Sequence, residues 1–124
     1  MKRNLADTLQ KAPNDCWYAI EKIGEAMRGD GGSGIIFGEP ATHVLLKIIS
    51  DFKSATKELD EDWETNDELS YDLPEIEYAI TQLGMFLRRE ESDIGSSRAG
   101  QIFLEFLQLR LRNLVDFAQS VDNR

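Results

Sequence analysis

The chain has 124 residues, a formal net charge of −9 and a hydrophobic fraction of 41%. This length fits a single domain, 1–124, and the hydrophobic fraction excludes a wholly disordered chain. No apolar run is long enough to cross a membrane, and the basic N-terminus lacks the apolar stretch of a secretory signal. We therefore expect a cytoplasmic protein, and its one cysteine, Cys16, allows no internal disulfide.

The first half of the chain predicts three helices. Leu5 and Leu9 indicate a helical turn or two before Pro13, which cannot continue a helix. A second helix is expected over about 15–28, because its apolar residues recur on one face and Gly29 is a typical helix end. The glycine-rich stretch 29–39 is expected to be a loop. Pro40 then suits the first turn of a third helix that runs to about Leu59.

The second half predicts an acidic loop and two further helices. The stretch 60–72 is interpreted as the end of the third helix plus the loop, and Asp72 as the cap of a helix from Pro74 to about Glu90. The last helix, about 98–120, is apolar nearly all round and is therefore expected at the centre of the molecule. Arg110 lies among its apolar residues, so its charge must reach solvent, pair with an acid or face a partner. The predicted fold is all-α: a compact four- or five-helix bundle with a central apolar C-terminal helix and an acidic inter-helix loop.

The negative charge is concentrated in one segment. Residues 58–87 contain ten Asp or Glu and no Lys, Arg or His. The two flanking parts are nearly neutral, with eight basic and seven acidic residues in 1–57 and six of each in 88–124. Such a field repels phosphates and anionic lipids and attracts basic surfaces, so neither nucleic acid nor a membrane is an expected direct partner.

No motif predicts a catalytic, cofactor or metal site. Residues 29–34 match G-x-G-x-x-G, but a helix precedes them and no phosphate-binding Lys follows, so a connector is expected. The only histidine, His43, falls on the polar side of its helix. The alternating acids from Asp60 lack the Gly and the final Glu of a calcium loop, and one Cys with one His cannot make a zinc site. We therefore expect a protein that is not an enzyme.

The acidic segment is the strongest functional signal, although most charge runs are simply solvated loops. Trp63 and Tyr71 lie inside it, and aromatic residues surrounded by carboxylates can anchor and steer a basic partner. Tyr78 and Met85 are expected beside it, on the outer side of the next helix. The residues expected to bind the partner are Glu61, Asp62, Trp63, Glu64, Asp67, Glu68, Tyr71, Asp72, Tyr78 and Met85.

This pattern leads to the hypothesis of an inhibitory binding protein. The favoured setting is a bacterial immunity protein that neutralises a toxin, such as a nuclease with a basic cleft, as an antitoxin does. One alternative is a phage-encoded acidic inhibitor that mimics nucleic acid, although a mimic would spread its charge in a longer stripe. Another is a structural or adaptor subunit of a helical assembly that associates through its last helix. A monomer is favoured over a self-associating chain.

Overall fold

The computed structural model describes residues 4–29 and 31–124, apart from the side chains of 31–37. Within these residues the chain forms five helices and a two-residue strand. In chain order they are α1 (Asp7–Gln10), β1 (Asn14–Asp15), α2 (Cys16–Arg28), α3 (Gly31–Lys57), α4 (Asp67–Leu87) and α5 (Ser97–Asp122). The predicted all-α bundle is confirmed.

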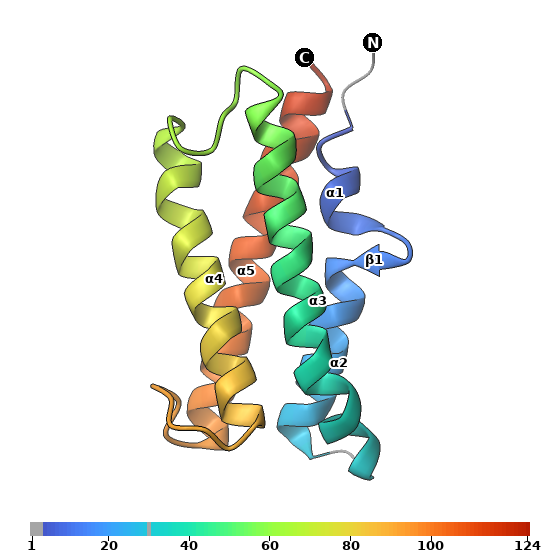
Figure 1. Ribbon diagram of the computed structural model, residues 1–124, viewed down its shortest axis with the longest axis vertical. Coiled ribbons are helices and arrows are strands. Elements are labelled where there is room, and N and C mark those ends of the chain that lie inside the picture. The colour runs from blue at the N-terminus through green and yellow to red at the C-terminus, as the bar shows by residue number, and fades with distance from the viewer. Residues whose placement is uncertain (1–3, 30) are drawn as a thin grey trace.

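The four long helices lie along the longest axis of the molecule, and the start of the described chain, near Leu5, lies at the same end as the C-terminal residues of α5 (Figure 1). Helix α2 packs mainly against α3 and α5, and α4 packs against the same two helices. The four helices therefore surround one core, to which α1 adds Leu9. The carboxylate of Asp122 fixes the N-terminal segment to the end of α5, because it accepts hydrogen bonds from the backbone N–H groups of Leu5 (2.6 Å) and Ala6 (2.9 Å).

Helix α2 begins and ends where the sequence predicts. The carboxylate of Asp15 accepts a hydrogen bond from the backbone N–H of Trp17 at 2.7 Å, which satisfies a donor that the helix leaves unpaired. At the other end Gly29 adopts a left-handed conformation (φ 69°) and closes the helix onto Ala26.

The glycine-rich stretch is not the loop predicted over 29–39, because α3 begins at Gly31 and Pro40 lies inside it. Part of the reason is the close contact between α2 and α3. A Cβ atom at Gly38 would overlap the Cβ of Ala26 and would lie 3.2 Å from the backbone oxygen of Lys22. Glycine at this position therefore allows two helices to approach each other, a role that glycine composition alone does not distinguish from a turn.

Helix α5 occupies one side of the bundle instead of its centre. Its buried residues share one face, whereas Ile102 and Leu109 are 60% and 56% exposed. The expectation of a central helix that is apolar nearly all round was therefore wrong. The apolar residues of α5 form two faces, one in the core and one toward solvent beside α4.

Candidate functional site

The acidic segment is divided between a loop and the start of α4. The loop covers 58–66, and α4 begins at Asp67, so the prediction of a loop as far as Asp72 was wrong. The cap is Asn66 and not Asp72: its side-chain oxygen accepts hydrogen bonds from the N–H groups of Glu68 and Leu69, both at 3.0 Å. Asp67 and Glu68 occupy the first turn, where carboxylates interact favourably with the helix dipole.

Half of the ten acids in the segment are paired with bases from other parts of the chain. Arg110 on α5 contacts Asp72 and Glu75, at 2.7 and 3.3 Å. The other pairs are Lys57 with Glu64 at 2.8 Å, Lys53 with Glu77, and Arg124 with Glu61. The segment therefore carries much less uncompensated charge than its sequence indicates, and part of it holds the bundle together.

Trp63 is packed against the bundle and is not a free anchor. Its ring contacts the core, and the ammonium of Lys53 lies 4.3 Å from the ring centroid. Its backbone N–H donates to Oγ1 of Thr56, a fully buried residue of α3, at 3.1 Å. These contacts fasten the acidic loop to the last turns of α3.

The uncompensated part of the predicted site is the outer side of α4. Asp67 and Glu68 are exposed, and none of the ion pairs among the described residues includes either of them. Tyr71 and Tyr78 are 62% and 48% exposed. Their positions along α4 place these acids and tyrosines on one side of the helix, and Met85, half-buried, continues that side.

A groove between α4 and α5 borders this side. It has a volume of about 360 Å³ and is lined by Glu75, Tyr78, Ala79, Ile102, Phe103 and Phe106. Tyr78 and Phe103 meet across it, with ring centroids 6.4 Å apart. The contribution of α5 was missed by the sequence reasoning, because its apolar residues were all assigned to the core. The signal was present in the spacing of Ile102, Phe106 and Leu109, which is offset from that of the buried residues.

Comparison of the chain with protein-family models, with curated proteins and with solved structures found no match. The site therefore has to be interpreted from its own chemistry.

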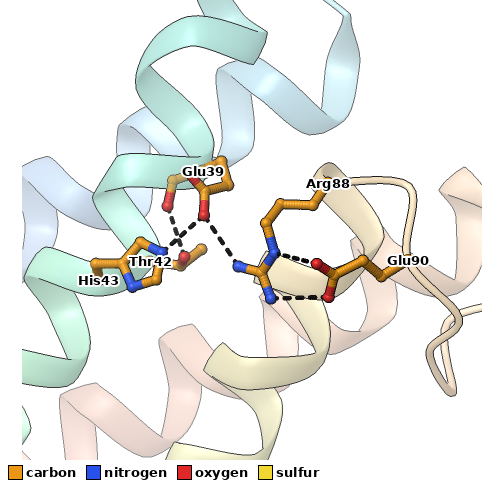
Figure 2. A network of polar contacts seen from close by, with 5 residues as sticks. All are labelled: Glu39, Thr42, His43, Arg88 and Glu90. Atoms are coloured by element: carbon orange, nitrogen blue, oxygen red, sulfur yellow. Dashed lines mark hydrogen bonds and ion pairs between the residues drawn. The ribbon is translucent and has the colours of Figure 1, made fainter.

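The single histidine belongs to a polar network that joins α3 to α4 (Figure 2). Oε1 of Glu39 accepts hydrogen bonds from Arg88 Nη1 at 2.9 Å and from His43 Nε2 at 2.7 Å. Arg88 also donates from Nε and Nη2 to the two carboxylate oxygens of Glu90. The hydrogen bond from Arg88, followed by that from His43, lowers the pKa of Glu39. His43 is exposed, as its place on a polar helix side predicted. The network makes a surface link between two helices.

The other residues considered in the sequence for catalysis, phosphate binding or metal binding do not form a site together. Cys16 is fully buried, and burial followed by the charge of Asp15 raises its pKa to about 12. In the G-x-G-x-x-G stretch, Asp30 lies outside the described residues. In the part of the chain that the structure describes, no group of three or more His, Cys, Asp or Glu side chains could hold a metal ion. No helix described there has the length and apolarity needed to span a bilayer.

Proposed function

We propose that this protein is an inhibitory binding protein that covers a basic surface of another protein. The observation that carries the proposal is the outer side of α4, where the unpaired carboxylates of Asp67 and Glu68 lie beside the exposed rings of Tyr71 and Tyr78. Exposed aromatic residues supply large contact areas, and nearby carboxylates raise the association rate of a basic partner.

The mechanism is steric and electrostatic blockade. The carboxylates at the start of α4 pair with Lys or Arg of the partner, and the tyrosines fill apolar pockets next to them. Asp62 extends the acidic surface onto the loop, where Glu64 is already paired with Lys57. Trp63 contributes by fixing that loop against α3, and the acids already paired within the chain contribute less to binding than their number suggests.

The favoured setting is an immunity protein that neutralises a bacterial toxin with a basic substrate cleft. Because half of the acids are paired internally, the free carboxylates form a short patch and not a long stripe. A short patch fits a cleft better than it imitates the regular phosphates of a duplex, so a nucleic-acid mimic is the second candidate. An adaptor subunit that associates through Arg110 has less support, because Arg110 is paired within its own chain.

The proposal is tested by affinity capture from the source cell at low salt. The immobilised wild type is compared with a variant that combines Asp67→Asn, Glu68→Gln and Tyr71→Ala. A matched control, Tyr18→Ala with Glu21→Gln, removes an equally exposed tyrosine and an acid from α2. A basic protein should bind the wild type and the control, should be lost from the triple variant, and should dissociate as salt screens the charges. Capture of no basic protein, or equal capture by the triple variant, would contradict the proposal.

A further inference from the structure

The outer side of α4 carries a heptad pattern that does not serve the core. Six residues follow one another at alternating intervals of three and four, the spacing that keeps one stripe of a helix toward a neighbouring helix. They are Glu68, Tyr71, Glu75, Tyr78, Gln82 and Met85. The buried residues of α4, such as Leu73, Ile76 and Ile80, form a separate stripe. Helix α4 therefore has a second face suited to helix packing.

Helix α5 carries a matching pattern on the other side of the groove. Ile102, Phe106, Leu109 and Asn113 also alternate at intervals of four and three. Four of the six large hydrophobic residues that are exposed in the described part of the chain lie on these two stripes. They are Tyr71, Tyr78, Ile102 and Leu109. Exposed apolar residues concentrated in this way mark an interaction surface.

We propose that the α4–α5 groove binds an amphipathic α-helix of the partner, with apolar residues facing the groove and Lys or Arg facing α4. This inference rests on the proposed function and specifies the element that is recognised. The groove between Ile102, Phe106 and Tyr78 receives the apolar residues, as in other complexes in which a helix lies in a groove. From Glu68 to Gln82 the stripe is about 21 Å long, so it accommodates about four turns of helix.

Charge complementarity determines the kind of helix. Glu68 and Glu75 are seven residues apart on the α4 stripe, so basic residues one heptad apart on the incoming helix would meet both. Arg110 lies 3.3 Å from Glu75 Oε2, yet that oxygen accepts no hydrogen bond among the described residues. That oxygen is buried, but the side chain of Glu75 as a whole is 35% exposed, so a cation of the partner can still approach it from the groove side. A second copy of this chain is a poorer occupant, because each copy brings the same acids and a net charge of −9.

The test uses two synthetic peptides about three heptads long, with Leu at the a and d positions and Lys at the e and g positions of one peptide. The other peptide has Glu in place of each Lys. Each is titrated into the full chain, and backbone amide shifts are followed by NMR. We expect the Lys peptide to bind about tenfold more tightly than the Glu peptide and to shift amides of 68–82 and 102–113.

Two variants, one on each helix of the groove, are tested separately, so that the result does not depend on one variant folding correctly. Tyr78→Ala and Ile102→Ser should each weaken the Lys peptide about tenfold, whereas Val44→Ser, at an exposed apolar position on α3, should not. The inference is overturned by no binding at millimolar peptide, by equal affinity for both peptides, by shifts confined to the Tyr18–Val44 side, or by a homodimer that uses this groove. If only the groove inference is wrong, the Lys peptide does not bind the groove, but the protein still inhibits the partner captured from the cell. If the proposed function alone fails, the Lys peptide still binds but no partner is inhibited.

Discussion

Arg110 of α5 donates a hydrogen bond from Nη1 to Oδ1 of Asp72 on α4, across 2.7 Å. The guanidinium also lies 4.9 Å from the ring centroid of Phe106, and both ion-paired side chains are largely buried. Arg110 lies among apolar residues in the sequence of α5, and its charge is paired with an acid 38 positions earlier in the chain. The pair links the two helices that form the groove, and it removes one carboxylate from the surface available to a partner.

Arg110→Met should lower the free energy of unfolding by about 1 to 2 kcal/mol, because Asp72 would lose its partner while remaining mostly buried. Urea unfolding of Arg110→Met, Asp72→Asn and the double variant measures the coupling between the two residues. We expect the double variant to lose less than the sum of the two single variants. Additive losses would mean that the pair does not stabilise the α4–α5 contact.

Gly38→Ala should destabilise the protein by about 2 to 3 kcal/mol, because the new methyl group overlaps Ala26 and forces α2 and α3 apart. Gly95→Ala is the matched control, since a Cβ there meets no atom within 4 Å. Thermal unfolding of both variants distinguishes packing from a general effect of replacing glycine. Equal melting temperatures for the two variants would contradict the close contact at Gly38.

Cys16 should not react with thiol reagents while the protein is folded. Burial removes access to the sulfur and raises its pKa to about 12, so very little thiolate is present at pH 8. Labelling should be fast in denaturant, where the pKa returns to its ordinary value, and slow in buffer. Rapid labelling of the native protein at pH 8 would show that α2 is not packed as described.

The Glu39 network predicts a loss of stability in acid. The pKa of Glu39 is lowered in the folded protein from its ordinary value of 4.5, chiefly by Arg88. The contribution of Glu39 is therefore complete above pH 4.5 and is lost as the pH falls through the lowered value. Unfolding measured against pH should show a smaller acid loss for Glu39→Gln than for the wild type. The difference should shrink in high salt, because the network is exposed to solvent. If the wild type and Glu39→Gln lost the same amount of stability at low pH, Glu39 would not have this role.

Trp63→Ala should lower stability even without a partner, by about 1 to 2 kcal/mol, because it removes contacts with the core and with Lys53. Tyr71→Ala, which replaces an exposed ring, should change stability by less than about 0.5 kcal/mol. Denaturant unfolding of the two variants tests this contrast. Equal stabilities of Trp63→Ala and Tyr71→Ala would mean that Trp63 does not hold the loop and is free to bind a partner.

Much of the fold could be predicted from local signals. The spacing of apolar residues on one face and Gly29 as a helix end predicted α2, and the structure caps it with the Asp15 side chain and the left-handed Gly29. The start of α4 was missed because Pro74 was interpreted as a helix start. The stripe that runs back through Leu73 to Leu69 and the Asn66 cap indicate the earlier start.

The candidate site was harder to predict, because its charge balance depends on tertiary contacts. The bases that neutralise Glu61 and Asp72 lie 63 and 38 positions away along the chain. No local pattern in 58–77 indicates them. The exposed stripe of α5 was hidden for a related reason: Ile102 and Leu109 are apolar, and only the place of α5 in the bundle shows that they face solvent.

The most direct test of the central claim is an activity titration of the captured partner with increasing amounts of the purified protein. Our account predicts that activity falls to an endpoint at one molecule of protein per partner. The variant that combines Asp67→Asn, Glu68→Gln and Tyr71→Ala should need about 30-fold more protein for the same inhibition, which corresponds to about 2 kcal/mol of binding. The account would be contradicted if the partner kept full activity at saturating wild-type protein, or if the variant inhibited the partner as well as the wild type does.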